Sequence, residues 1–153
     1  MNITDLITKE TVLLDIEAKD KHDVIYKVAS ALHTKGVIEN VDTYVDDVLA
    51  REAQGSTGIG YGIAIPHAKS DAVNTPALAF ARIKGGVDYE ALDGENSDLL
   101  FMIAVPSGGE NLHLKILQRL SRKLMHDDFR DALRDATDEE NILTILNEMD
   151  KEE

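Results

Sequence analysis

The sequence predicts a single α/β domain in which helices cover a β-sheet, and three observations support this prediction. Apolar segments typical of strands alternate along the 153 residues with amphipathic segments typical of helices. Residues 99–105 are seven consecutive apolar residues, a pattern typical of a central strand covered on both faces. The chain has no internal repeat or linker, and its length and 43% hydrophobic content are sufficient for one buried core.

The first third of the chain is expected to contain one strand and two helices. Residues 12–15 form a short apolar segment that predicts a strand. Asp20 is placed to cap a helix that continues to about residue 35 and ends at Gly36. A second helix is expected over about residues 41–53, with Arg51 in its last turn, where a cation suits the helix dipole. Its buried side is expected to consist of Tyr44, Val45, Val48 and Leu49.

The middle of the chain is expected to be rich in strands and glycine turns. Regular structure should be interrupted by Gly55, Gly58, Gly60 and Gly62. A brief buried strand is then expected over residues 63–65, ended by Pro66. Residues 77–82 predict the next strand, and Gly85-Gly86 predicts a turn toward a short segment over residues 87–89.

The last third of the chain follows the predicted central strand with three helices. The first should span about residues 112–125 and bury Leu114, Leu117, Leu120 and Leu124. Asp127 is expected to cap a short helix that reaches about residue 136. The sequence Thr137-Asp-Glu-Glu140 predicts a capping box for a final helix over residues 139–149.

Composition excludes several classes of function. The net charge of −13 argues against nucleic acid or an anionic membrane surface as the main partner. The absence of cysteine excludes disulfides, thiolate metal sites and a cysteine nucleophile. No apolar run approaches the roughly 20 residues that span a bilayer, and the N-terminus lacks the pattern of a signal peptide. We therefore expect a cytoplasmic protein with no direct membrane insertion.

His67 is the strongest candidate for chemistry. It follows a short apolar strand and a glycine-rich turn, with Arg51 sixteen residues upstream. Neutral imidazole is a nitrogen nucleophile near pH 7, and its phosphoryl adduct remains reactive enough to pass the group on. Arginine and backbone N–H groups can neutralise the phosphoryl oxygens during transfer. This combination predicts a phosphoryl-carrying histidine.

His113 is a second candidate because, like His67, it follows the C-terminal end of a predicted strand, where ligands collect in open α/β sheets. It also falls in the first turn of a predicted helix, where free N–H groups favour an anion. Taken alone, His113 fits a surface or hydrogen-bonded histidine better than a catalytic one. The remaining three histidines are expected on polar helix faces or at a helix end: His22, His33 and His126.

Other cofactor and ligand patterns are weak. Gly58-Ile-Gly-Tyr-Gly62 follows a helix and precedes a strand, which is the wrong order for a dinucleotide-binding turn. The chain contains neither a P-loop motif nor a metal-binding histidine pattern, so no metal or other cofactor is expected. Ser56 and Thr57 could donate hydroxyl groups to a phosphoryl oxygen, but local bonds within a turn explain them at least as well.

These residues lie in motifs that resemble the type-2 (fructose/mannitol-type) enzyme IIA domain of the phosphoenolpyruvate-dependent sugar phosphotransferase system. The resemblance covers nearly the whole chain, so the domain is expected to span residues 1–153. The motifs that carry it are Arg51-Glu-Ala-Gln-Gly-Ser-Thr-Gly-Ile-Gly-Tyr-Gly-Ile-Ala-Ile-Pro-His67, Leu99-Leu-Phe-Met-Ile-Ala-Val-Pro106 and Leu112-His-Leu-Lys-Ile-Leu117.

The resemblance implies a mixed sheet with helices on both faces and a role for each candidate residue. His67 matches the histidine that accepts a phosphoryl group from HPr and passes it to a cysteine of a sugar-specific enzyme IIB. Arg51 matches the active-site arginine, and His113 matches the second histidine, which hydrogen-bonds the phosphoryl group.

The resemblance is greatest to the fructose branch of the family. Mannitol members carry an acidic residue in the turn before the phosphorylated histidine, whereas this chain has Tyr61. The nitrogen-related regulatory branch shares the Gly-Ser-Thr-Gly-Ile-Gly element, so the alternative function is a protein-binding switch controlled by phosphorylation of His67. A third alternative is that the chain is one domain of a larger transporter or regulator.

Overall fold

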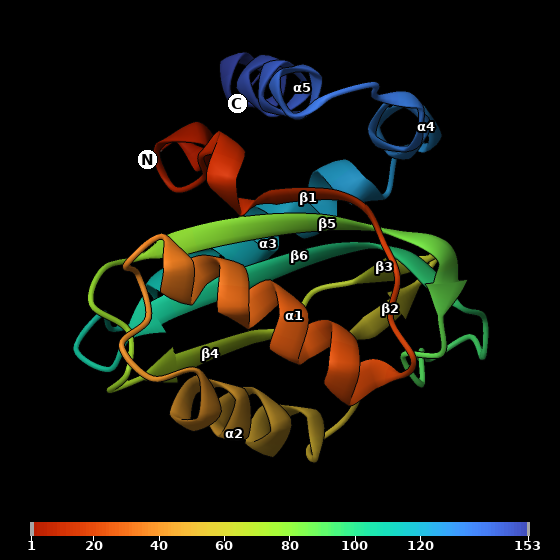
Figure 1. Cartoon of the computed structure of the whole chain (residues 1–153). Coiled ribbons are helices and arrows are strands. Elements are labelled where there is room, and N and C mark those ends of the chain that lie inside the picture. Colours follow the sequence, from red (N-terminus) through yellow and green to blue (C-terminus); the bar gives the residue numbers. More distant parts are fainter. Residues whose placement is uncertain (1, 153) are drawn as a thin grey trace.

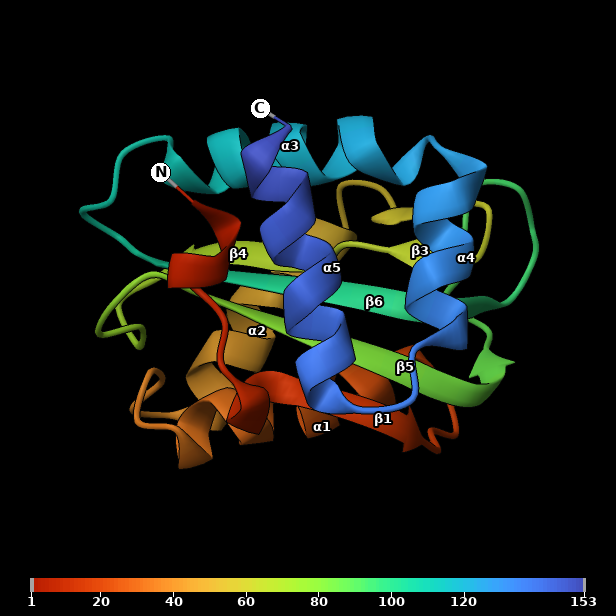
Figure 2. The same ribbon diagram turned by 90° about the horizontal axis from the view of Figure 1, so that it is seen from above.

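The computed structural model describes residues 2–152 and shows one open, mixed sheet with helices on both faces (Figures 1 and 2). The strands are β1 (Val12–Ile16), β2 (Gly58–Gly60), β3 (Ile63–Ala64), β4 (His67–Ser70), β5 (Ala77–Val87) and β6 (Ser97–Pro106). The helices are α1 (Lys21–Thr34), α2 (Val41–Glu52), α3 (Leu112–Leu124), α4 (Asp127–Asp135) and α5 (Glu139–Lys151), preceded by the short 3-10 helices η1 (Ile3–Asp5) and η2 (Lys9–Thr11). The predicted α/β class and the mixed sheet are confirmed. Residues 1 and 153, the limits of the expected domain, lie outside the described residues.

The strand β6 separates two hydrophobic cores because successive side chains of a strand point to opposite faces of the sheet. Leu100, Met102 and Ala104 pack with α1 and α2 on one face. The alternate residues pack with α3, α4 and α5 on the other face: Leu99, Phe101, Ile103 and Val105. Figure 2 looks onto the face of the sheet that carries α3, α4 and α5, and α1 and α2 lie behind the sheet in this view. The predicted central strand is therefore buried on both sides, as its seven apolar residues indicated.

The sheet has the order β1-β5-β6-β3-β2. β4 also pairs with β6, farther along that strand than β3 does. Both β3 and β4 run parallel to β6, with Ile63 beside Leu99 and His67 beside Ile103. Pro66 has no N–H to donate, which explains the break between the two strands, but its carbonyl accepts a hydrogen bond from the Ile103 N–H at 3.0 Å. His67 was expected just after a strand; instead it begins β4.

Two expectations about glycine segments were wrong. Gly58–Gly60 forms β2, antiparallel to β3, and the hairpin turns at Tyr61 and Gly62 with positive φ angles of 57° and 77°. The predicted turn at Gly85-Gly86 lies inside β5, which continues to Val87. Both glycines have positive φ, and the register against β6 shifts between Arg82 and Val87. These glycines therefore form an irregularity within a strand rather than its end.

The C-terminal helices differ from the prediction in which side chains of α3 are buried and in which residues cap α4 and α5. In α3 the fully buried residues are Ile116, Leu120 and Leu124, whereas Leu114 is 48% exposed. Leu114 lines a surface cavity, whereas Leu112 of the same helical turn packs against the core.

The N-terminal caps of α4 and α5 are also one residue away from their predicted positions. His126 occupies the N-cap position of α4, and Asp127 is the first helical residue. At α5 the cap is Asp138, whose side chain accepts a hydrogen bond from the Asn141 N–H at 2.8 Å, and not Thr137. By contrast, the predicted cap of α1 is confirmed, since Asp20 accepts from the Asp23 N–H at 2.8 Å.

The described part of the chain contains no helix that is both long and apolar enough to cross a membrane.

We expect Phe101→Ala to lower the free energy of unfolding by about 3–5 kcal/mol, because it removes a buried ring from the central strand. The Phe101 ring packs at 4.9 Å between centroids on Phe80, so truncation leaves a cavity. The control is Leu92→Ala, at a side chain that is 74% exposed, which should change stability by no more than about 0.5 kcal/mol. Chemical denaturation of both variants tests this, and similar losses in the two would contradict it.

Candidate functional site

A cavity of about 300 Å³ lies where α2, β4 and the start of α3 meet at the edge of the sheet. It is lined by Asp47, Ala50, Arg51, Gln54, His67, Ala68, Lys69, His113 and Leu114. The structure thus brings together the three residues that the sequence singled out, although sixty-two residues separate Arg51 from His113. Each comes from a different element, so the parallel pairing of β4 with β6 and the packing of α2 on β4 create the site.

The orientation of the His67 ring leaves one nitrogen ready for chemistry. The side chain is only 5% exposed, and its Nδ1 lies 2.8 Å from the carbonyl oxygen of Ile65. Because a carbonyl can only accept a hydrogen bond, Nδ1 carries the proton of the neutral ring. The lone pair is therefore on Nε2, the nitrogen that can act as a nucleophile.

The surroundings of His67 favour its neutral form. Burial is the largest influence and lowers the pKa of His67 below its ordinary value of 6.5. The bond to the Ile65 carbonyl opposes this shift, the positive charge of Arg51 adds to it, and the negative charge of Glu52 opposes it. The net shift is downward, so most of the imidazole is neutral at pH 7.

His113 faces His67 across the site. The two ring centroids are 6.2 Å apart, a separation too large for direct hydrogen bonding between the rings. Among the described residues, the buried Nδ1 of His113 has no hydrogen-bond partner. Burial, together with the charges of His67 and Lys69, lowers the pKa of His113. A buried ring nitrogen without a partner is stabilised when a ligand supplies one.

Arg51 supplies a permanent positive charge beside the two histidines. It lies in the last turn of α2, and its Nη1 donates to the carbonyl oxygen of Gly55 at 2.9 Å. This bond uses only one of the five guanidinium N–H donors. The others are available to an anion, and guanidinium groups bind phosphoryl oxygens strongly.

Ser56 and Thr57 are not among the residues that line the cavity. The Ser56 hydroxyl accepts from the Gly58 N–H at 3.0 Å and donates to the Tyr89 carbonyl at 3.3 Å. The Thr57 hydroxyl donates to the buried carboxylate of Glu52. Both hydroxyls thus support the turn between α2 and β2, in line with the turn explanation of these two residues.

Sequence reasoning missed three charged residues of this region, of which Asp47 of α2 lines the cavity. Lys69 lines the cavity, and it follows His67 by two residues in β4, so both side chains share one face of the strand. Had residues 67–70 been predicted as a strand, that spacing would have identified Lys69. Glu52 is buried beside Arg51. Nothing in the sequence identified it, because carboxylates on helices are mostly exposed to solvent.

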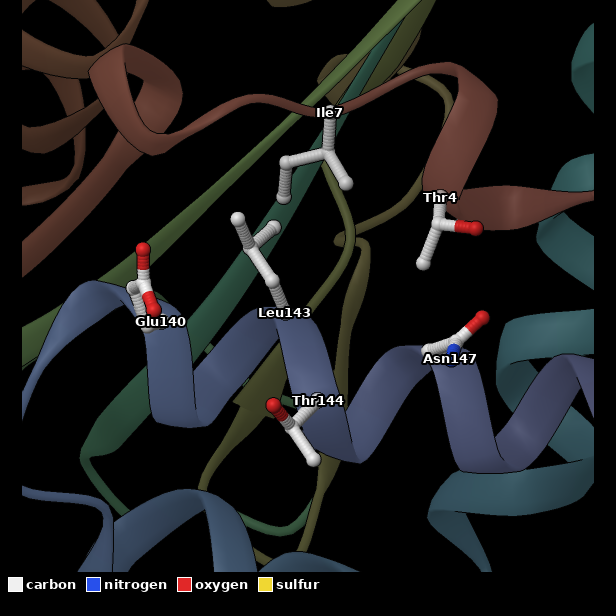
Figure 3. Close-up of a pocket in the computed structure, with 6 residues that line it drawn as sticks. All are labelled: Thr4, Ile7, Glu140, Leu143, Thr144 and Asn147. Atoms are coloured by element: carbon white, nitrogen blue, oxygen red, sulfur yellow. The ribbon is translucent and has the colours of Figure 1, made fainter.

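A second cavity, of about 330 Å³, lies between the N-terminal segment and α5 (Figure 3). In Figure 3, Ile7 and Leu143 point toward each other, with Thr4 and Asn147 at one side. Its lining contains no histidine, lysine or arginine. Within residues 2–152, no group of three or more histidine, aspartate or glutamate side chains is arranged to hold a metal ion. The cavity at His67 is therefore the candidate site.

The chain is similar to one known protein family over nearly its whole length. Residues 5–149 match the family model described as "Phosphoenolpyruvate-dependent sugar phosphotransferase system, EIIA 2". The chain is 48% identical to the fructose-specific EIIABC component of Bacillus subtilis over 99% of its own length, but it spans only 24% of that protein. It is 40% identical to the fructose-specific EIIA component of Haloferax volcanii, covering 97% of this chain and 99% of the relative.

The similarity extends to solved structures. The nitrogen regulatory protein IIA-Ntr of Neisseria meningitidis superimposes with a TM-score of 0.87 at 28% identity, covering 94% of this chain and 98% of that one. The family model covers almost the entire chain, and two relatives that exceed 30% identity are matched along nearly all of this chain. The chain therefore belongs to the type-2 EIIA family of the phosphoenolpyruvate-dependent sugar phosphotransferase system, and it is a phosphotransferase component of that system.

Proposed function

We propose that this protein is a fructose-type enzyme IIA that carries a phosphoryl group on His67. It accepts the group from phospho-HPr and passes it to the cysteine of a fructose-type enzyme IIB, which couples the relay to sugar uptake and phosphorylation. The observation that carries this proposal is the His67 ring: its proton is held on Nδ1 by the Ile65 carbonyl, and its Nε2 is free beside Arg51 and His113.

In the first transfer, Nε2 of neutral His67 attacks the phosphorus of the HPr phosphohistidine. The new N–P bond forms as the N–P bond to HPr breaks, and the leaving imidazole of HPr takes back the electron pair. The Nδ1 proton stays in its bond to the Ile65 carbonyl, so the phosphorylated ring is cationic. In the second transfer, the thiolate of enzyme IIB attacks the same phosphorus, and neutral His67 is the leaving group.

Arg51 and His113 are the groups that stabilise the phosphoryl oxygens in this proposal. Both line the same cavity as His67, and a ring nitrogen of His113 that carries its proton can donate a hydrogen bond to the phosphoryl oxygens. Positioning and charge account for most of the catalysis in phosphoryl transfer, so these residues are sufficient for the roles assigned to them. Ser56 and Thr57 are left out of the phosphoryl site because their hydroxyls are bonded elsewhere.

The choice of fructose and of a cytoplasmic location rests on relatives. The B. subtilis and H. volcanii proteins, at 48% and 40% identity, are both named as fructose-specific. Because this chain spans a quarter of the B. subtilis protein, the activity of a whole EIIABC transporter is not transferred to it. HPr and enzyme IIB act in the cytoplasm, so we place this domain there.

A regulatory role is the second candidate, and specific similarities support it. Nitrogen regulatory proteins are among the relatives, one of them from Bradyrhizobium diazoefficiens at 34% identity over 95% of each chain. In that role, phosphorylation adds a group with about two negative charges beside α2 and α3, partly offset by the positive charge of the ring, and this alters the surface offered to a protein partner. Phosphorylation of His67 is common to both candidates, and only onward transfer distinguishes them.

The deciding experiment incubates the protein with phosphoenolpyruvate, enzyme I and HPr, then adds purified fructose-type enzyme IIB. Intact mass spectrometry follows acid-labile phosphate on both proteins. We expect label at His67 that moves to the cysteine of enzyme IIB. Label that stays on this protein would favour the regulatory role or a different sugar, and no label at all would refute the carrier function.

The first prediction concerns the nucleophile. His67→Ala should abolish phosphorylation by phospho-HPr, because Nε2 is the atom that bonds to phosphorus. Circular dichroism should show a folded protein. The matched control is His33→Ala, at an exposed histidine in the last turn of α1, which should be labelled at the wild-type rate. Residual acid-labile label in the His67 variant would show that another residue is the acceptor.

The second prediction concerns the anion-binding groups. Arg51→Ala and His113→Ala should each slow phosphoryl transfer by about 100-fold while leaving measurable labelling, as found when one preorganised donor is removed from an active site. Rapid-quench kinetics with phospho-HPr measures these rates. Arg51→Lys should recover only part of the loss, because lysine keeps the charge but lacks the planar fork of donors. Wild-type rates in both alanine variants would contradict these roles.

The third prediction concerns pH. Because the pKa of His67 lies below 6.5, more than half of its rings should be neutral at pH 6.5, and the acceptance rate should fall to half its maximum at a pH below 6.5. The unfolded chain binds this proton more readily than the folded chain does. The stability that His67 contributes is therefore present above pH 6.5 and is lost as pH falls toward the lowered pKa. Titration of the His67 ring by NMR measures this pKa, and a midpoint at or above 6.5 would contradict the assignment.

A further inference from the structure

Glu52, the last residue of α2, has a buried carboxylate with four hydrogen-bond donors around it. It accepts from the Thr57 N–H at 3.0 Å, from the Thr57 hydroxyl, and from the Tyr89 hydroxyl at 3.1 Å. The ammonium of Lys21 lies 2.9 Å away. Burial raises the pKa of Glu52, but the bonds from Thr57 and Lys21 outweigh it, and the net shift is downward. The carboxylate is therefore charged at neutral pH.

Two short hydrogen-bond routes connect Glu52 to the residues of the site. The first runs through Thr57, whose carbonyl accepts from the Ile65 N–H at 3.0 Å. The Ile65 carbonyl in turn accepts from Nδ1 of His67 at 2.8 Å. Glu52 thus anchors the peptide that sets the tautomer and the orientation of the nucleophile.

The second route runs through Gly55, which lies between Glu52 and Thr57 in the turn after α2. The Gly55 N–H donates to the backbone carbonyl of Glu52 at 3.0 Å, and the Gly55 carbonyl accepts from Nη1 of Arg51 at 2.9 Å. Because the Glu52 side chain holds Thr57 at the far end of this turn, it also limits where the Arg51 guanidinium can lie.

The negative charge of Glu52 is opposite in sign to the two basic side chains that line the cavity with His67. Arg51 from α2 and Lys69 from β4 are positive and line the cavity, and His113 from α3 faces the ring. Asp47 of α2 supplies a carboxylate to the lining, whereas Glu52 is not among the lining residues. Glu52 is the carboxylate whose charge acts on His67 in opposition to Arg51.

We propose that Glu52 is a positioning residue for phosphoryl transfer at His67. Through Thr57 and Gly55 it holds the carbonyls that orient the imidazole and the guanidinium, and its negative charge stabilises the cationic ring that forms when Nε2 bonds to phosphorus. The inference rests on the carrier function proposed above. It assigns a role in the reaction to a residue that does not itself touch the phosphoryl group.

The test compares Glu52→Gln with Tyr89→Phe. The first variant removes the charge and keeps the shape of the side chain, whereas the second removes one donor to the carboxylate and keeps its charge. Both are measured in the whole protein by NMR titration of His67 and by the pH dependence of the acceptance rate from phospho-HPr. A purely structural role would alter stability in both variants without moving the titration of His67.

We expect Glu52→Gln to lower the pKa of His67, to move the acid limb of the rate profile to lower pH, and to slow transfer by about tenfold or more. Tyr89→Phe should leave the pKa unchanged and the rate within about twofold of wild type. If Glu52→Gln fails to fold, Glu52→Asp replaces it. That variant keeps the charge but shortens the reach to Thr57, and it should slow transfer without lowering the pKa of His67.

Two outcomes separate this inference from the proposed function. A wild-type protein that accepts no phosphoryl group would refute the carrier function itself. A labelled wild type, together with a Glu52→Gln variant that matches it in both pKa and rate, would refute only the role of Glu52. Equal effects of Glu52→Gln and Tyr89→Phe on the pKa would also overturn the inference, because they would show that packing and not charge controls the ring.

Discussion

The parallel pairing of residues 63–70 with β6 is the constraint on which the rest of the site depends. Pro66 breaks this segment into β3 and β4 without releasing it from the sheet, because its carbonyl still accepts from Ile103. His67 therefore begins a strand whose backbone is held by the most buried element of the protein. A side chain placed in this way starts from a fixed backbone, and the proposed phosphoryl transfer would benefit from such a preorganised geometry.

Opposing influences act on the pKa of His67, and their balance would suit the proposed carrier. Burial and Arg51 favour the neutral ring, while the Ile65 carbonyl and Glu52 favour the positive charge that the ring would gain on phosphorylation. A carrier must both accept and release its group, so neither state of the histidine can be strongly favoured. The supporting contacts come from α1, α2 and the segment after β5, which links the chemistry to the packing of one whole face of the sheet.

Much of the fold could be predicted from local sequence. The apolar run of β6, the helical periodicity of α1 and α2, and the Asp20 cap all follow from patterns within a few residues. The errors arose where tertiary contacts override local preference. Gly85 and Gly86 predict a turn, but pairing with β6 carries β5 through them. Leu114 fits an apolar stripe, but its side chain lines the cavity and is 48% exposed.

The sequence by itself determined the class of fold and three of the residues that line the candidate site, because His67, Arg51 and His113 are carried by specific motifs with recognisable chemistry. Only the tertiary structure decided which nitrogen of His67 is free, since that depends on a bond to Ile65. The tertiary structure also showed that Ser56 and Thr57 do not line the cavity. It showed as well that the buried Glu52 carboxylate is bonded to Thr57 in the turn after α2. Hydrogen bonds and burial are relations between distant residues in space, and no local pattern of amino acids records them.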